Sequence, residues 1–345
     1  MIKSVFIAAA LAAQPAGADP VDALEQRLQA GETEGPQFQS ALDAVRAAAE
    51  AGDAQAMHML GWLIIAGYVE AQPETARTWF ERAIEAGEPA LAEQATVDLA
   101  FSYYGQSDTP ERGRALLQAL EDAGPAKARR DAFLGYDLLV GVGGEPDPAY
   151  GQALINGALA RGFSEVWLIE SAGDFWNQRE DGVQDALRMY DEATRRGSAS
   201  AAWRYAMIVL RDGGDPADAW RYVAWSSEQG YEDAMISRAV MLATGQGVDA
   251  DPAAARDWYA RAARRGSAHG ARGLGAMLLT GEGGPADPAR GYALLELAAA
   301  GEDPVAGQWL EEPPRSAAAR PGADAVAAAR QAFLSEAGLT ADDFR

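Results

Sequence analysis

The sequence contains no cysteine, only two histidines, and only two lysines, Lys3 and Lys127. The absence of cysteine excludes disulfide bonds, thiol nucleophiles and thiolate metal sites. A chain of 345 residues is still long enough to bury a large apolar core, so packing alone can hold its fold. Because His58 and His269 are far apart in the chain, they offer no paired ligands, and we expect no metal and no cofactor.

The sequence also lacks any apolar run of the about 20 residues that a membrane-spanning helix needs. Its start shows a shorter pattern: Lys3, a run of nine apolar residues at 5–13, and then Ala16-Gly17-Ala18. This order is typical of a secretory signal peptide that is cleaved after Ala18, with a buried N-terminal helix as the alternative. A composition rich in alanine and arginine but poor in lysine indicates a GC-rich bacterial genome. We therefore expect residues 1–18 to be removed and the protein to be periplasmic.

Basic residues are few: 29 lysines and arginines face 51 aspartates and glutamates, which gives a net charge of −22. A chain this acidic repels nucleic acids and anionic membrane surfaces. We therefore expect no nucleic-acid partner and no direct insertion into a membrane, and we attribute the charge mainly to solubility.

A glycine recurs along the chain at intervals of 33 to 38 residues. It stands at Gly52, Gly87, Gly124, Gly162, Gly197, Gly230, Gly266 and Gly301. A proline precedes six of these glycines by 13 or 14 residues, at Pro73, Pro110, Pro148, Pro216, Pro252 and Pro288. Two markers that coincide in six segments indicate an internal repeat.

The proline and the glycine of each unit mark the two ends of one helix. An Asp or Thr before the proline forms an N-cap with proline at the first helical position, and the glycine suits a left-handed C-terminal turn. These caps are Thr109, Asp147, Asp215, Asp251 and Asp287. Between Asp251 and Gly266 the apolar residues Ala255, Trp258, Tyr259, Ala262 and Ala263 share one helical face. We predict that Trp258, and Trp79 at the same place in an earlier unit, belong to the core.

Another helix fills the first half of each unit, most clearly at residues 56–67. Glycines 61, 135 and 275 stand where the two helices of a unit must approach closely. The stripe of Met57, Leu60 and Ile64 is predicted to face the core. Short Gly-rich turns, such as residues 245–248, join the two helices and lack the Lys-Ser or Lys-Thr of a phosphate-binding loop.

The complete unit, A-x-x-x-L-G followed by a Gly-rich turn and then A-x-x-W-Y-x-x-A-A-x-x-G, resembles the Sel-one-like repeat (SLR) family, a relative of the tetratricopeptide repeats. Residues 230–266 carry the pattern best, and residues 52–87 and 266–301 carry it well. The resemblance implies an all-α fold, a right-handed α-solenoid of stacked helix pairs with a concave face. After the signal peptide we expect a single helical repeat domain at 19–345. It would comprise a partial unit at 19–52, seven units at 52–301 and C-terminal capping helices at 302–345.

The resemblance also implies that the first helix of each unit lines the concave groove. One stripe of these helices carries the candidate binding residues His58, Trp62, Arg129, Tyr136, Trp176, Trp203, Arg211, His269 and Arg272. Aromatic residues and arginines are enriched at binding hot spots, and packing between neighbouring units is the alternative role for each aromatic residue.

No motif for nucleophilic or metal-assisted catalysis is present, and we predict that the protein is not an enzyme. By resemblance, we expect a periplasmic protein–protein interaction protein, an adaptor or regulator in envelope signalling or assembly. Its partner would be another protein, periplasmic or membrane-bound. The alternative is a cell-wall or polysaccharide-associated hydrolase or glycan-binding accessory. Two carboxylates that face each other in a closed cleft would favour that alternative, whereas an open groove would favour the adaptor.

Overall fold

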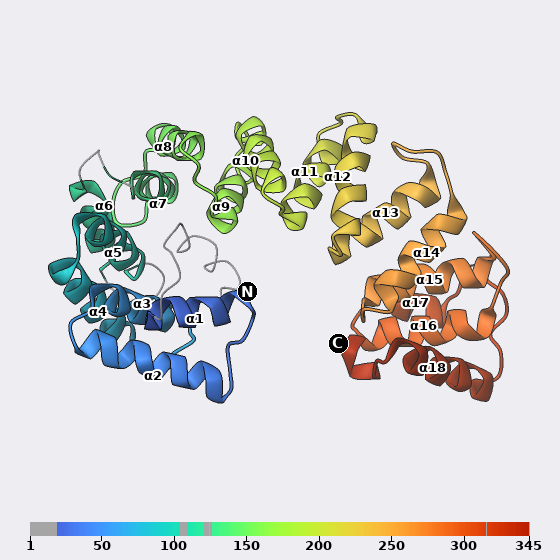
Figure 1. Cartoon of the computed structure of the whole chain (residues 1–345). Helices are drawn as coiled ribbons and strands as arrows, with labels where there is room; N and C mark the ends of the chain where they lie inside the picture. The colour runs from blue at the N-terminus through green and yellow to red at the C-terminus, as the bar shows by residue number, and fades with distance from the viewer. Residues whose placement is uncertain (1–18, 104–108, 121–123, 125, 315, 345) are drawn as a thin grey trace. The chain divides into compact units, whose positions relative to one another are not determined.

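The computed structural model describes residues 19–103, 109–120, 124, 126–314 and 316–344. Throughout these residues the regular secondary structure is helical, without a β-strand (Figure 1). The predicted all-α fold of stacked helix pairs, an α-solenoid, is therefore confirmed. The predicted signal peptide at 1–18 lies outside the described residues. The right-handed twist and the single domain stay predictions.

The chain divides into two compact units, of which unit 1 ends at Gly182 and unit 2 begins at Val183. Unit 1 contains α1 (Pro20–Gln29), α2 (Pro36–Glu50), α3 (Ala54–Ile65), α4 (Pro73–Ala86), α5 (Pro89–Phe101), α6 (Pro110–Ala119), α7 (Lys127–Val140), α8 (Pro148–Ala160) and α9 (Val166–Asn177). Unit 2 contains α10 (Val183–Arg195), α11 (Ala199–Arg211), α12 (Pro216–Glu228), α13 (Glu232–Thr244), α14 (Pro252–Ala263), α15 (Ala268–Thr280), α16 (Pro288–Ala300), α17 (Pro304–Glu311), α18 (Ala323–Ala337) and the short 3₁₀ helix η2 (Ala341–Phe344). None of the described helices is long and apolar enough to cross a membrane.

The helix starts agree with the predicted caps, with one exception. The carboxylates of Asp147, Asp215, Asp251 and Asp287 each accept a hydrogen bond from a backbone N–H in the first turn of the helix that follows. Thr109 precedes Pro110 as predicted, but its side chain caps no backbone N–H. In these four second helices the Asp cap and the proline set the first helical residue. The distance from the proline to the glycine after the helix is therefore nearly constant.

The helix ends follow the glycine marker less closely. Gly52, Gly162, Gly197, Gly230 and Gly266 have a positive φ, as a left-handed turn requires. Gly87 and Gly301 do not, with φ at −86° and −84°, which corrects the prediction for these two repeats. In the last of them Glu302 takes the left-handed conformation instead, with φ at 61°. A Cβ on Gly301 would collide with the carbonyl oxygen of Phe344, so close packing is the requirement that this glycine meets.

The core lies between the two helices of each pair. Met57, Leu60 and Ile64 are buried, as predicted. A Cβ on Gly61 would stand 2.6 Å from the ring of Phe80, so this glycine does mark a close helix approach. Trp258 is buried at 9% exposure, but Trp79 is only half-buried at the edge of its cluster, which corrects its assignment to the core.

We predict that Trp258→Ala lowers the free energy of unfolding by ~3–5 kcal/mol, because it removes a large buried ring from the core between α13 and α14. The neighbouring repeats should stay folded, since the stability of a helical repeat stack is roughly a sum of local terms. Urea unfolding followed by circular dichroism measures the change. Trp79→Ala is the matched control and should cost less, and an equal cost in the two variants would contradict this account of the core.

Candidate functional site

The predicted stripe lies on the first helices of the pairs. His58 and Trp62 are on α3, Arg129 and Tyr136 on α7, Trp176 on α9, Trp203 and Arg211 on α11, and His269 and Arg272 on α15. In unit 1 the first helices also contact one another, α3 with α5, α5 with α7, and α7 with α9. The stripe therefore runs along one continuous layer of unit 1, and its side chains meet those of the next first helix.

Four side chains in this layer form a buried polar chain, which we define as His58, Asp98, Arg129 and Glu165. His58 Nε2 lies 2.8 Å from Asp98 Oδ2, and Arg129 Nη1 lies 2.7 Å from Asp98 Oδ1. Arg129 Nε donates a hydrogen bond of 2.6 Å to Glu165 Oε1. The four side chains come from α3, α5, α7 and the N-cap of α9, so the polar chain links four successive first helices.

The charged groups of the polar chain stabilise one another in their ionised forms. Burial alone would raise the pKa of Asp98, but the charge of Arg129 and the hydrogen bond to His58 outweigh it and lower that pKa. Burial would likewise lower the pKa of Arg129, yet Asp98 and Glu165 raise it further above its ordinary value. Arg129 is thus a permanent cation between two carboxylates, with a side chain that is only 14% exposed. The sequence analysis missed both carboxylates that cover Arg129, Asp98 and Glu165.

The aromatic residues of unit 1 are also occupied by packing. Trp62 is buried and stacks on Tyr68, and the indole N–H of buried Trp176 donates a hydrogen bond to Gln152. Tyr136 is half-buried and hydrogen-bonded to Ser171 of α9, and burial raises its pKa. Tyr136 and Trp176 thus join neighbouring helices, whereas Trp62 packs on the turn that follows its own helix.

A cluster that the sequence analysis missed lies beside the polar chain. The rings of Phe101, Phe133 and Trp167 come from α5, α7 and α9, with centroids 5.4 to 5.7 Å apart. Phe133 is buried, whereas Phe101 and Trp167 are partly exposed. The indole N–H of Trp167 donates to Glu165, which ties this cluster to the polar chain. The helices α5 and α9 depart from the repeat pattern, so no regular spacing pointed to these rings.

In unit 2 the stripe is more open. Trp203 is half-buried, and its indole N–H donates a hydrogen bond of 3.0 Å to Ser237 of α13. The side chain of Arg211 is 50% exposed and pairs with the adjacent Asp212. Trp203 and Arg211 therefore leave part of their side chains exposed to solvent on the side of unit 2 that the first helices form.

Further along unit 2, His269 and Arg272 both point toward Asp303. Asp303 is the N-cap of α17 and is buried, and Arg272 Nε donates a hydrogen bond of 2.9 Å to it. Burial would raise the pKa of Asp303, but the backbone N–H of Ala306 and the guanidinium of Arg272 lower it. His269 lies 3.8 Å from the same carboxylate, and its side chain is 63% exposed, more than those of Arg211 and Arg272.

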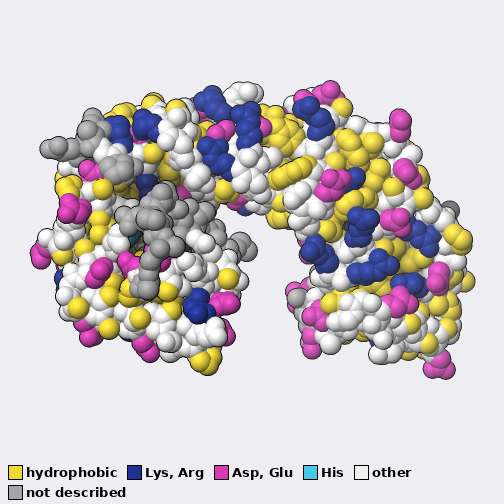
Figure 2. Space-filling view, in the orientation of Figure 1, with side chains coloured by type: hydrophobic (Ala, Val, Ile, Leu, Met, Phe, Trp, Pro, Cys, Tyr) yellow, Lys and Arg dark blue, Asp and Glu magenta, His cyan; other side chains and the backbone are white. Residues whose placement is uncertain are grey.

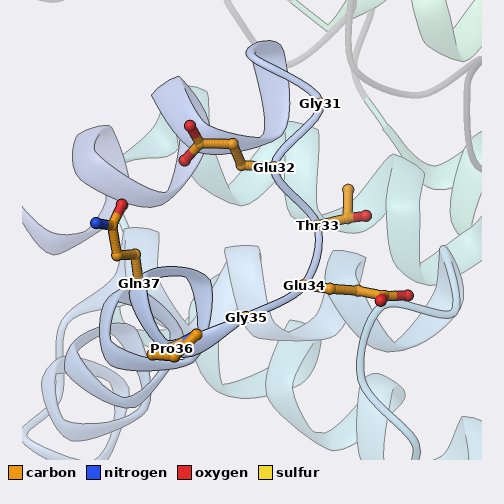
Figure 3. A pocket seen from close by; sticks show the side chains of 7 residues that line it. All are labelled: Gly31, Glu32, Thr33, Glu34, Gly35, Pro36 and Gln37. Carbon is orange, nitrogen blue, oxygen red and sulfur yellow. The ribbon is translucent and has the colours of Figure 1, made fainter.

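A hollow at the loop between α1 and α2 is lined by residues 31–37 (Figure 3). The side chains of Glu32 and Gln37 extend to one side of the loop and that of Glu34 to the other. Arg27 already donates hydrogen bonds to Glu32 and Gln37, at 2.8 and 2.9 Å. The hollow therefore brings no two free carboxylates together.

The described residues contain no group of three or more histidines or acids that could hold a metal ion. Among the carboxyls, Glu25 on α1 has a raised pKa, caused first by burial and then by Asp22 and Asp19. Both neighbours belong to the start of the same helix and do not face Glu25 across a cleft. His58 of α3 also acts on Glu25, and its charge lowers the pKa of Glu25.

The stacked helix pairs and their inter-helix side-chain bridges define a helical repeat protein of the tetratricopeptide-like class. A family model for the Sel1 repeat matches residues 54–88, 232–267 and 268–303. The resemblance found in the sequence is therefore confirmed, and the chain is a protein with Sel1 repeats. Sel1 repeats generally serve as protein–protein interaction modules, and proteins built from them are typically non-catalytic.

The fold is similar to that of a solved structure with an SLR fold. A protective antigen of uropathogenic Escherichia coli that displays an SLR fold is 18% identical, with a TM-score of 0.59 over 94% of this chain and 74% of that chain. A Sel1 repeat protein from Oxalobacter formigenes is 20% identical, with a TM-score of 0.48 over 82% of this chain and 97% of that chain. A comparison with curated proteins finds no match.

We predict that Arg129→Met destabilises the protein by ~3–5 kcal/mol at neutral pH, because it leaves Asp98 and Glu165 buried without their cation. In the wild type the lowered pKa of Asp98 contributes stability that is present above its unfolded value of about 3.8 and is lost as the pH falls through the folded value. The difference between wild type and variant should therefore shrink below about pH 4. Urea titrations at several pH values measure it, and a difference that stays constant down to pH 2 would contradict the role assigned to the polar chain.

Proposed function

We propose that the protein is a non-enzymatic periplasmic adaptor or regulator that holds a segment of a partner protein against its first helices. The observation that carries this proposal is the accessible first-helix side of unit 2, where Trp203, Arg211, His269 and Arg272 retain exposed surface. Tryptophan and arginine are the residues most enriched at binding hot spots. A guanidinium binds carboxylates bidentately and stacks on rings, so a segment with acidic and apolar residues suits this surface.

The stripe residues of unit 1 are covered by neighbouring side chains, whereas those of unit 2 are partly exposed. This difference favours unit 2 as the main binding surface for the partner protein. In unit 1 the corresponding positions are filled by neighbours: Arg129 lies between two carboxylates, and Trp62 and Trp176 are buried. A partner that displaced these contacts would have to leave buried charges unpaired, which is costly. In unit 2 a partner can reach Trp203 and Arg211 without that cost, because they bond to Ser237 and to the exposed Asp212. The alternative, a cell-wall hydrolase or glycan-binding accessory, has no supporting arrangement of carboxylates among the described residues.

The location in the periplasm rests on the first 18 residues of the sequence. We predict that the protein purified from the periplasmic fraction of its host starts at Asp19. Intact-mass spectrometry of that fraction measures the N-terminus. Recovery of the chain from the cytoplasm with Met1 retained would contradict export, and it would leave the binding proposal to be tested inside the cell.

The binding proposal is tested on a partner recovered by crosslinking and mass spectrometry from the native host. We predict that Trp203→Ala and Arg211→Ala each weaken its binding by ~1–3 kcal/mol, the range for hot-spot truncations. Calorimetry with the purified partner measures the loss, and circular dichroism should show unchanged helical content.

Matched controls come from the second helix α12 in the same unit. Trp225 is a half-buried tryptophan, and Arg221 is an exposed arginine in an ion pair with Asp218, so each resembles its counterpart in α11. Trp225→Ala and Arg221→Ala should leave the affinity unchanged. If both α11 variants bind normally while an α12 variant loses binding, the first-helix surface is the wrong one.

A further inference from the structure

Basic side chains gather over the part of unit 2 that contains α14 and α15 (Figure 2). The charged residues are also unevenly distributed along the sequence. Residues up to Gly182 include 12 basic and 28 acidic residues, whereas those from Val183 include 17 basic and 23 acidic residues. We define the arginine patch as Arg261, Arg264 and Arg265. All three are exposed and stand at positions i, i+3 and i+4, so they share one face at the end of α14.

The arginine patch has no acidic partner within the described part of the chain. Arg261 lies over the ring of Trp258, with its guanidinium carbon 4.3 Å from the centroid. Arg265 donates a hydrogen bond of 2.8 Å to the carbonyl oxygen of Gly230. These two contacts orient the guanidinium groups and leave most of their N–H donors unused, because each group has five.

The ends of α10 and α14 have the same local sequence and can be compared directly. The end of α10 repeats the sequence Arg-Arg-Gly-Ser at residues 195–198, as the end of α14 does at 264–267. The backbone is the same in both: the glycine has φ near +90°, at 92° and 86°, and the serine caps the next helix. The two segments are therefore equivalent positions of two repeats.

The charge at these equivalent positions differs. In α10, Arg195 pairs with Asp191 at 2.6 Å, and both Arg195 and Arg196 pair with Glu192. The positions of Asp191 and Glu192 are taken in α14 by Ala260 and Arg261. The end of α14 has thus lost two carboxylates and gained one guanidinium.

The dipole of α14 does not account for this difference. A helix C-terminus favours cations, which offsets part of the repulsion among the three arginines. The C-terminus of α10 offers the same partial charge and nevertheless carries two carboxylates that neutralise its arginines. The dipole is common to both helices, so it cannot be the reason that only one of them lacks its acids.

We propose that the arginine patch is a docking surface for a carboxylate-rich segment of a partner protein, whose acidic side chains occupy the place that Asp191 and Glu192 hold in α10. The proposal rests on the proposed function, since it assigns a second contact to the same partner. The patch lies on a second helix and is separate from Trp203 and Arg211. Charge complementarity selects the occupant: a protein with a net charge of −22 repels acidic segments everywhere except where cations are left unpaired.

The test uses the full chain and a fluorescein-labelled deca-glutamate peptide as probe, with deca-glutamine as the uncharged comparison. Deca-glutamate should bind with an affinity that falls as salt is added, and deca-glutamine should not bind. The triple variant Arg261→Gln, Arg264→Gln, Arg265→Gln should bind at least about tenfold more weakly. Binding of the two peptides with equal affinity, or an unchanged triple variant, overturns the proposal.

A second variant transplants the acids of α10 into α14. In Ala260→Asp with Arg261→Glu, the new carboxylates should pair with Arg264 and Arg265 one turn later. Deca-glutamate binding should be lost while the melting temperature is maintained or raised, which separates loss of the site from loss of the fold. Retained binding in this variant overturns the proposal.

Matched controls probe arginines in equivalent positions. Arg195→Gln with Arg196→Gln removes the neutralised pair of α10, and Arg82→Gln removes an exposed arginine that lies over Trp79 at 4.5 Å. Both should bind deca-glutamate like the wild type, and a tenfold loss in either overturns the assignment to α14. Preferential binding to phosphatidylglycerol vesicles would assign the patch to a membrane surface and also overturn it.

The partner of the first-helix surface separates this proposal from the proposed function. If Trp203→Ala loses that partner while the arginine-patch variants keep it at full affinity, only the arginine-patch inference fails. If neither change affects the partner, the proposed function fails as well.

Discussion

A helix pair of this protein buries its apolar face only by packing against the pair beside it, and the other features of the structure depend on that requirement. The pairs must approach closely, which explains glycine at positions such as Gly61 and Gly135, where a Cβ would meet Phe80 or the backbone of Gly151. The stack also needs an end. At the C-terminus α18 and η2 pack on α16 and bury Phe333 and Phe344, so the last pair does not expose its core.

Close packing of first helices creates a second requirement, because polar side chains on that layer lose their contact with water. The polar chain of unit 1 meets it with alternating charge: His58, Asp98, Arg129 and Glu165 come from successive helix pairs and satisfy one another. In unit 2 single hydrogen bonds satisfy the polar groups of this layer, from Trp203 to Ser237 and from Arg272 to Asp303. Side chains of the predicted binding stripe are therefore also the side chains that join neighbouring repeats.

This double role bears on function. Where two buried carboxylates cover one guanidinium, as at Arg129 in unit 1, the stripe is closed. Where the bridge is a single hydrogen bond or a cap, as at Trp203 and Arg272, part of the side chain stays accessible. The arginine patch at the end of α14 extends the same reasoning to a second helix, where the acids that neutralise the equivalent arginines of α10 are absent. Both surfaces lie in the unit with the smaller excess of acidic residues.

The sequence by itself determined the class of fold and the capped starts of four second helices, at Asp147, Asp215, Asp251 and Asp287. It could do so because these depend on local signals: an Asp-Pro cap, a glycine end, and apolar residues at helical spacing. The three segments matched by the Sel1 repeat are also the ones in which these signals are most regular. Tertiary structure decided which stripe residues are covered, because the partners of His58 and Arg129 are 31 to 40 residues away and lie on helices that depart from the repeat pattern. It also decided that Trp79 stays half-exposed while Trp258 is buried between Arg238 and Arg261. Local spacing specifies which face of a helix is apolar, but only the neighbouring repeat specifies how much of that face, and which of its charges, remain exposed to solvent.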